Sequence, residues 1–212
     1  MAWKPDYVSS AELKTYLRIG DTADDALVAT CVTAASRAVD HACNRQFGVL
    51  TSTAVRYYTY GAEYLDGRQA VPIDDLQTTT GLAVAVDTDD NATWDTTITS
   101  ATDFDLWPWN AAENGLPWTH VVLRAGTALG SFPNGAARAI RVTALFGWTA
   151  VPKLVVEATQ LQAARFFSRR NATFGVAGSP EVGSEVRLLE RLDPDVAVAL
   201  RPVRRASWGG VV

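Results

Sequence analysis

The sequence predicts an α+β protein in which two helical parts flank an inserted small antiparallel β-domain. Apolar residues recur with a helical period over about residues 9–47. The period changes to that of short strands separated by turns over about 50–150, and the helical period then returns. We therefore expect an N-terminal helical part at 1–49, the β-domain at 50–150, a C-terminal helical part at 151–202 and an extended tail at 203–212.

Two helices are expected in the N-terminal part. Ser9 and Glu12 have the spacing of a capping box, which predicts a short helix that runs to about Arg18. Acidic residues then open a longer helix that ends near Phe47. At 100° per residue, one narrow arc of this helix is mostly alanine, and Ser36 falls on the opposite, polar arc. The small residues predict close contact with another helix through Leu27, Cys31, Ala34, Ala38 and Ala42, and Val28, Ala35 and Val39 widen this face on one side.

The middle of the chain has the composition of short β-strands. Segments rich in β-formers are separated by turn residues such as Asp66-Gly67 and Asn134-Gly135. In the last of these segments, Ile140, Val142 and Ala144 alternate with more polar residues, which predicts one buried face. We expect strands near residues 55–60, 71–73, 82–86, 121–123 and 139–146.

The C-terminal part opens with a predicted helix that reaches about Arg170. Leu154 and Leu161 project on one side and Phe166 on another, so this helix should contact two neighbours, one of which could be another subunit. A polar line that contains Arg165 and Arg169 runs between the two sides, and it allows ion pairs between subunits or contact with DNA. The candidate intersubunit face is Leu154, Leu161, Arg165, Phe166 and Arg169.

Composition narrows the class of protein. The 212 residues carry a net charge of −4, divided into −7 for residues 1–150 (10 basic, 17 acidic) and +3 for residues 151–212 (9 basic, 6 acidic). This polarity is too mild for a nucleic-acid-binding signature. Cys31 and Cys43 lie roughly 18 Å apart along one predicted helix, which is too far for a disulfide. We expect no membrane span and no secretory signal.

The search for catalytic or metal-binding patterns finds none that holds. His41 and His120 have no partner at metal-ligand spacing. The acidic segment 87–91 resembles a calcium loop but fails at the required glycine and glutamate. Asp103 and Asp105 share a strand face, yet no cationic neighbour can be identified to separate their pKa values. We therefore expect no enzymatic activity, no metal and no cofactor.

Tryptophan is abundant, with seven residues, five of them in the β-domain. They could fill a small core, stack on sugars, or anchor a protein interface, since tryptophan is enriched at binding hot spots. The candidate interface residues are Trp107, Trp109 and Trp118.

Two segments at opposite ends of the chain together carry a family resemblance. The first runs from Tyr7 to Phe47 and ends in Cys-Asn-Arg-Gln-Phe. The second comprises 158–170, the segment Phe-Gly-Val-Ala-Gly-Ser-Pro-Glu at 174–181, and 188–205. This combination resembles the head-to-tail connector (adaptor) proteins of tailed bacteriophages, especially long-tailed phages of actinobacteria. The resemblance covers the helical half of the chain, so it implies nothing about the β-insert.

The resemblance implies a structural virion protein. Such connectors bind below the portal as a twelve-fold ring, extend the DNA channel, and join the capsid to the stopper and the tail after genome packaging. The implied partners are the portal protein, the stopper, further copies of the chain, and genomic DNA that passes through the lumen to ejection without sequence-specific binding. The implied location is the neck of the virion, and the host cytoplasm during assembly.

The tail at 203–212 is expected to dock on the portal or on an adjacent subunit through Arg204, Arg205 and Trp208, unless it is a disordered terminus. Two other functions remain open on the sequence. One is a carbohydrate-binding or adhesion module built on the tryptophan-rich insert. The other is a stopper or tail-completion protein, which would be mainly β.

Overall fold

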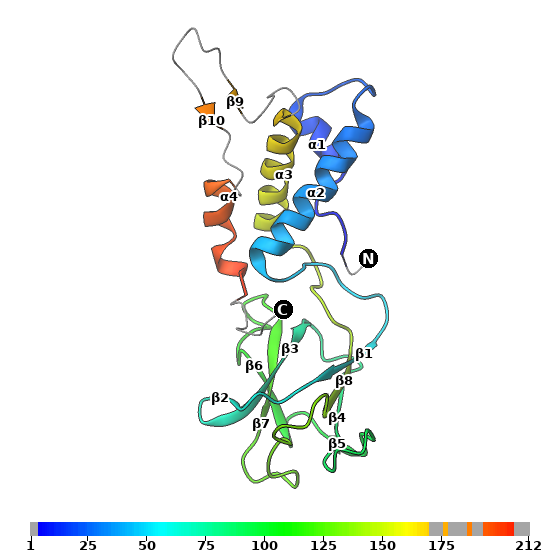
Figure 1. Cartoon of the computed structure of the whole chain (residues 1–212), viewed down its shortest axis with the longest axis vertical. Coiled ribbons are helices and arrows are strands. Elements are labelled where there is room, and N and C mark those ends of the chain that lie inside the picture. The colour runs from blue at the N-terminus through cyan, green and yellow to red at the C-terminus, as the bar shows by residue number, and fades with distance from the viewer. Residues whose placement is uncertain (1–3, 170–175, 178–185, 188–192, 206–212) are drawn as a thin grey trace. The chain divides into compact units, whose positions relative to one another are not determined.

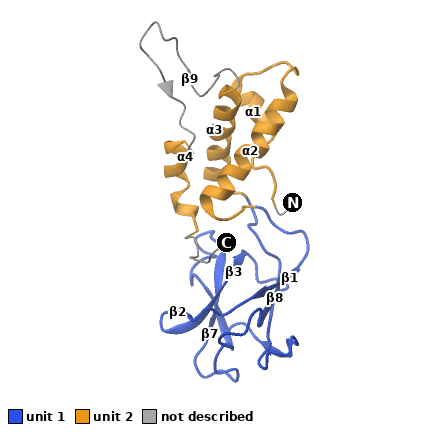
Figure 2. Ribbon diagram, viewed as in Figure 1, with its two compact units in different colours: residues 1–3, 48–150 blue, residues 4–47, 151–212 orange. Residues whose placement is uncertain are grey.

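The computed structural model describes residues 4–169, 176–177, 186–187 and 193–205. It divides into two compact units (Figure 2). Among the described residues, unit 1 is 48–150 and unit 2 is 4–47 together with the residues from 151 onward. Unit 1 contains two antiparallel sheets and unit 2 contains the α-helices (Figure 1). The predicted α+β class, with helical parts on both sides of an antiparallel β-insert, is confirmed.

Helix α1 (Ser10–Leu17) begins with the predicted capping box. The Ser9 hydroxyl accepts a hydrogen bond from the Glu12 N–H at 3.2 Å, and the Glu12 carboxylate accepts one from the Ser9 N–H at 2.7 Å. The Ser9 N–H and, to a lesser extent, the Ser9 hydroxyl stabilise the ionised carboxylate, and both therefore lower the pKa of Glu12. The helix ends at Arg18, which adopts the left-handed conformation at φ 58°.

Helix α2 (Asp25–Cys43) has its buried face centred on valine rather than alanine. Ala34 is exposed and Ala38 is half-buried, so the predicted alanine centre of this face was wrong, whereas Val28, Ala35 and Val39, expected on one side of it, are buried. Ser36, expected on the polar side, is fully buried because its hydroxyl donates to the Val32 carbonyl and accepts the Tyr7 N–H. The larger valine side chains gain more from burial than alanine does. The buried residues are Val28, Cys31, Val32, Ala35, Ser36, Val39 and Cys43.

Helix α3 (Lys153–Ser168) packs against α2 and completes the core of unit 2. Helix α4 (Pro194–Ala199) packs against α3 and leads into the 3₁₀ helix η4 (Arg201–Val203). Strands β9 (Val176–Ala177) and β10 (Val186–Arg187) pair antiparallel between α3 and α4. The core cluster shared by the first three helices is Val8, Leu13, Val28, Val32, Ala35, Ala163 and Ala164.

Unit 1 consists of two four-stranded antiparallel sheets around one core. One sheet has the order β1-β8-β4-β5 and the other the order β2-β3-β7-β6. Both contribute to a single cluster that includes Val71, Val121, Val84 and Ile140. The strands are β1 (Ala54–Tyr58), β2 (Glu63–Leu65), β3 (Arg68–Leu76), β4 (Ala83–Val86), β5 (Thr96–Ile98), β6 (Phe104–Trp107), β7 (Trp118–Leu123) and β8 (Ile140–Ala144).

The turn and the alternation expected from the sequence are present in unit 1. Asp66 and Gly67, at φ 49° and 75°, join β2 to β3 in the two-residue hairpin geometry that positive φ values allow. In β8, Ile140, Val142 and Ala144 are buried while the residues between them are half-buried. The short strands β2, β5 and β6 were not predicted, because three or four residues carry too little periodicity.

The two ends of unit 1 are fastened to each other where the chain enters and leaves it. Gly147 has φ 120°, and a Cβ added there would lie 2.1 Å from the Gly48 carbonyl oxygen. The Trp148 N–H donates to that same oxygen at 3.0 Å, and the Gly147 N–H donates to the Asp75 carbonyl at 2.7 Å. The indole of the buried Trp148 also donates to the Asp75 carboxylate at 2.9 Å. Only glycine fits at position 147.

Both cysteines lie in α2 and are free thiols. Cys31 is 5 % exposed and Cys43 is fully buried. Burial raises the pKa of Cys43 to about 11 and also raises the pKa of Cys31. Both groups are therefore protonated at neutral pH and pack as small apolar residues.

The close approach at Gly147 gives a first prediction. Gly147→Ala should lower the free energy of unfolding by more than about 3 kcal/mol, because a methyl group meets backbone at a positive φ. Gly135→Ala is the matched control: its φ is 83° with open space around the added atom, so only about 1–2 kcal/mol should be lost. Urea denaturation of both variants measures the difference. Equal losses would contradict the steric argument.

Candidate interaction surfaces

An ion pair joins α3 to the start of α4. Nη1 of Arg165 lies 3.0 Å from Oδ2 of Asp193, and both side chains are largely buried, at 16 % and 26 % exposed. Asp193 also caps α4 by accepting the Asp195 N–H, and its own N–H donates to the Gln162 side chain. Arg165 is therefore engaged within its own chain in this structure.

The other residues of the proposed intersubunit face are placed differently. Leu154 and Leu161 are half-buried, and so are Phe166 and Arg169. Phe166 packs against the helical core of its own unit. Leu154 and Leu161 are thus the best candidates in this face for contact with another copy, and the face remains a proposal.

The residues at the start of the predicted tail are bound to the end of α2. The Arg205 N–H donates to the Cys43 carbonyl at 2.9 Å, and the Asn44 side chain donates to the Arg205 carbonyl at 3.2 Å. Nη1 of Arg45 donates to the Val203 carbonyl at 3.1 Å. Arg204 lies between these contacts and is exposed, whereas Trp208 lies outside the described residues. The described part of the predicted tail, residues 203–205, therefore contacts its own chain.

The three tryptophans proposed as an interface have unequal exposure. Trp109 is 44 % exposed, and its indole N–H donates to Asp66 in the β2–β3 turn at 3.2 Å. Trp107 is half-buried with its ring edge against His120, and Trp118 is half-buried against the core of unit 1. Trp109 is the most exposed of the three and is therefore the one that a partner could contact most easily.

A second aromatic surface was missed in the sequence. The ring of Trp94 lies 4.7 Å from that of Tyr57, and the guanidinium of Arg138 lies 4.6 Å from the Tyr57 ring. Arg141 lies 5.7 Å from the Trp94 ring. These residues are 84 positions apart at the extremes, so only strand pairing brings them together. The alternation of Arg141 with buried Ile140 and Val142 was the available signal.

The carboxylates considered for catalysis have structural partners. Asp105 pairs with Arg124 at 2.8 Å and with Arg68 at 3.4 Å, so the expectation that it has no cationic neighbour was wrong. Asp103 accepts the Thr99 N–H at 2.7 Å. Asp87 accepts the N–H groups of Asn91 and Ala92, which folds its acidic loop without a metal ion.

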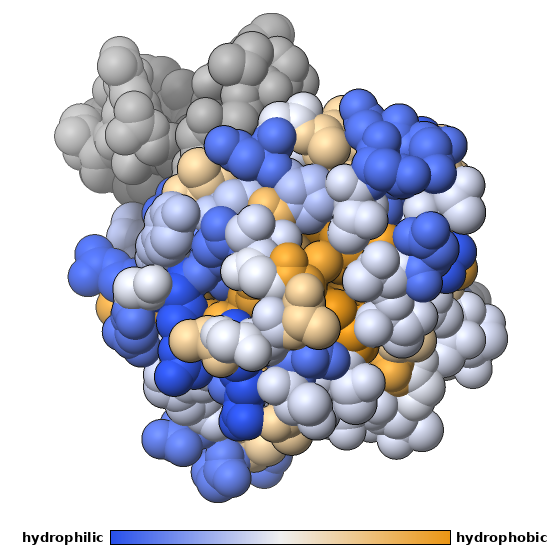
Figure 3. Space-filling model, turned by 90° about the horizontal axis from the view of Figure 1, so that it is seen from below, coloured by the Kyte–Doolittle hydropathy of each residue, from blue (hydrophilic) through white to orange (hydrophobic). Residues whose placement is uncertain are grey.

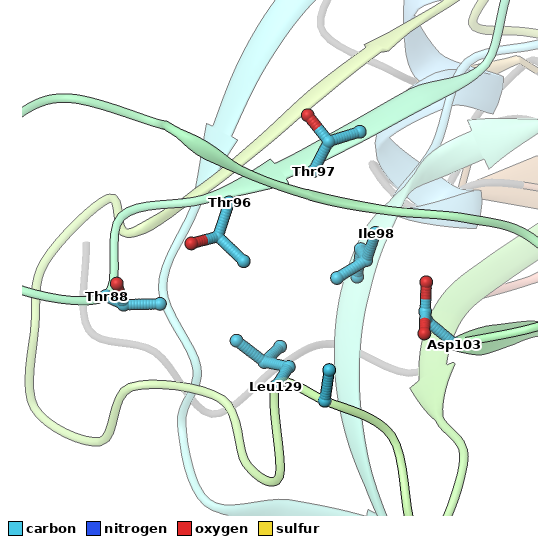
Figure 4. A pocket seen from close by; sticks show the side chains of 7 residues that line it. Thr88, Thr96, Thr97, Ile98, Asp103 and Leu129 are labelled. Atoms are coloured by element: carbon cyan, nitrogen blue, oxygen red, sulfur yellow. The ribbon is translucent and has the colours of Figure 1, made fainter.

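One small pocket in unit 1 contains Asp103 (Figure 4). Its volume is about 240 Å³, and the rest of its lining is threonine and small apolar residues: Thr88, Thr96, Thr97, Ile98, Ala128 and Leu129. The lining contains no histidine, lysine or arginine, so Asp103 has no acid–base partner in the pocket. The arrangement does not favour catalysis there.

Other features of the described residues bear on the class of protein. These residues contain no group of three histidine, cysteine or acidic side chains that could hold a metal ion. No helix within them has the length and apolar character needed to cross a membrane. The molecular face in Figure 3 is mostly hydrophilic with a smaller apolar area near its centre, as is common for a protein surface that includes local binding patches.

Comparison with known proteins gives a match to one family model and a similar fold in solved structures. Residues 10–101 match the model of the phage gp6-like head-tail connector protein family. The match confirms the resemblance to head-to-tail connectors. Two solved structures have a similar fold: a chain in the "Neck of empty GTA particle computed with C6 symmetry" (TM-score 0.51, 22 % identity) and one in the "Virion of native gene transfer agent (GTA) particle" (TM-score 0.52, 20 % identity). Each alignment covers 99 % of this chain and 96 % of the other. A search of curated proteins gives no match.

The Arg165–Asp193 pair gives a second prediction. Arg165→Met and Asp193→Asn should each lower the free energy of unfolding by about 1–3 kcal/mol. The double variant should lose less than the sum, with a coupling energy of about 0.5–3 kcal/mol. Because the pair is within one chain, the coupling measured by urea denaturation should not change on tenfold dilution. Lys153→Met, which alters an exposed residue of the same helix, is the control.

A coupling energy that disappears on dilution would show that Arg165 pairs between copies. In that case Arg165 would again be a candidate residue of the intersubunit face.

Proposed function

We propose that this protein is a head-to-tail connector that forms a ring below the portal, extends the DNA channel, and joins the capsid to the stopper and tail. The single observation that carries the proposal is the connector-family match over residues 10–101, which include α1, α2 and the first five strands of unit 1. The similar fold in neck and virion particles of a gene transfer agent supports it. The function is structural, and the protein is not an enzyme.

The partners follow from this role. They are the portal protein, the stopper, further copies of the chain in a twelve-fold ring, and genomic DNA passing through the lumen. DNA has to slide during packaging and ejection, so tight phosphate binding would be harmful. The negative balance of residues 1–150 supports a channel that does not retain DNA. The location is the neck of the virion, reached from the host cytoplasm.

The C-terminal segment is proposed to dock on the portal or on a neighbouring copy. Residues 203–205 are held against the end of α2 by hydrogen bonds, so the segment proposed to dock begins after Arg205. Deleting the chain from 203 would also remove those bonds and disturb the fold. A deletion that tests docking alone therefore begins at 206.

Binding to the portal vertex tests the proposed function directly. The purified protein is sedimented with DNA-filled capsids of its own phage that lack connectors, and the bound material is imaged. We expect a symmetric ring at the portal vertex. A folded protein that binds at no ratio would contradict the connector function and favour a ligand-binding role for the tryptophan-rich unit.

Docking of the C-terminal segment gives a third prediction. Deletion of residues 206–212 should raise the Kd for portal rings at least tenfold, which corresponds to about 1.4 kcal/mol of lost binding energy. Tyr64→Ala, which removes an exposed aromatic side chain from unit 1 instead, is the matched control and should leave this Kd within twofold. Sedimentation at increasing portal concentration measures both. An unchanged Kd for the deletion would refute docking by this segment.

A further inference from the structure

The outer face of the sheet β1-β8-β4-β5 consists of two rows of side chains that the strand register places side by side. The strand register places Tyr57 opposite Arg141, Arg141 opposite Ala85, and Ala85 opposite Thr97. Because side chains alternate along a strand, this row faces away from the core residues of the same strands. The next row on this face is Val55, Thr143 and Ala83. Neither row contains an acidic residue.

Trp94 packs at one end of this face. It lies in the connection between β4 and β5, yet its ring reaches Tyr57 in β1, at the opposite edge of the sheet. Its indole N–H donates to the Arg138 carbonyl at 3.1 Å, which fixes the ring. Tyr57 remains 38 % exposed and Val55 50 % exposed. The result is a preorganised aromatic surface beside an open apolar edge.

The two arginines of this face differ from the others in unit 1. Residues 48–150 contain five arginines and eleven acidic residues. Arg56 pairs with Asp74, and both Arg68 and Arg124 pair with Asp105. Arg138 and Arg141 lie over aromatic rings, as Arg56 also does, but within the described residues neither of the two forms an ion pair.

Stacking has a chemical consequence for the two guanidinium groups. A guanidinium held by its planar face keeps its edge N–H donors free, and those donors match a carboxylate in bidentate geometry. Carboxylates are abundant in unit 1 but are not used here. A carboxylate that binds these donors would therefore come from a partner.

We propose that this face, comprising Val55, Tyr57, Trp94, Arg138 and Arg141, is a docking surface for another protein of the neck that presents carboxylates. Tyrosine, tryptophan and arginine are the residues that most often dominate protein interfaces. DNA fits less well, because residues 48–150 have six more acidic than basic side chains and repel phosphate. A second copy of the chain is the other possible occupant, and the crosslink described below distinguishes it. The proposal rests on the connector function.

The fourth prediction separates this surface from capsid binding. Arg138→Glu/Arg141→Glu is compared with Lys153→Glu/Arg201→Glu, which changes the net charge equally at exposed residues of unit 2. Each protein is added to connector-deficient, DNA-filled capsids, and then to an extract that supplies the remaining neck and tail proteins. Sedimentation measures capsid binding, and plaque titre measures tail joining. Thermal unfolding checks that each variant is folded.

The charge-reversal variant should bind capsids as a normal ring but lower the titre at least tenfold, while the control matches the wild type. Arg138→Lys/Arg141→Lys should lower the titre less, since it keeps charge but loses the bidentate geometry. An unchanged titre would overturn the proposal. Loss of the ring would also overturn the proposal, because it would assign the face to contact between copies. Loss of DNA retention with normal tail joining would overturn it as well.

A crosslink identifies the occupant independently of the titre. A photoreactive phenylalanine analogue in place of Tyr57, activated in assembled particles, should form a bond to a different neck protein near an aspartate or glutamate. A bond to another copy of the chain would refute the proposal. Failure of the wild-type protein to bind capsids is a different result, because it contradicts the connector function itself.

Discussion

The contact between Gly48 and Gly147 is the constraint on which the two-unit organisation depends. An insertion within a helical protein is tolerated only if the chain leaves it close to where it entered. Here the entering carbonyl accepts the N–H of Trp148, and the close approach of the two backbones leaves no space for a Cβ at position 147. With its ends closed in this way, unit 1 forms its own core from two sheets, and unit 2 forms its core from helices that the insertion separates in sequence.

Local signals in the sequence predicted much of this fold. Ser9 and Glu12 located the start of α1 because capping depends on residues three positions apart. Asp66-Gly67 located a turn, because few other pairs adopt two positive φ values. The buried face of α2 was misplaced because periodicity alone does not weigh valine against alanine. It also does not show that the Ser36 hydroxyl finds two partners inside the core.

The interaction surfaces were harder to predict, for a physical reason. Arg165 and Asp193 are 28 residues apart, and Tyr57 and Arg141 meet only through the pairing of β1 with β8. Such contacts depend on tertiary structure, and a single sequence does not encode them as a pattern. The sequence led us to propose Trp107, Trp109 and Trp118 as an interface in unit 1. The rings of Trp107 and Trp118 are half-buried, and Trp94 was not among the candidates.

The burial of Cys31 and Cys43 has a practical consequence. Thiol-reactive dyes attack the thiolate, and both native thiols are shielded from solvent and remain protonated at neutral pH. Cysteines introduced on the surface would therefore be labelled selectively without first removing the native pair. One dye on each unit would report the distance between the β-insert and the helices by energy transfer, in solution and again in the assembled particle.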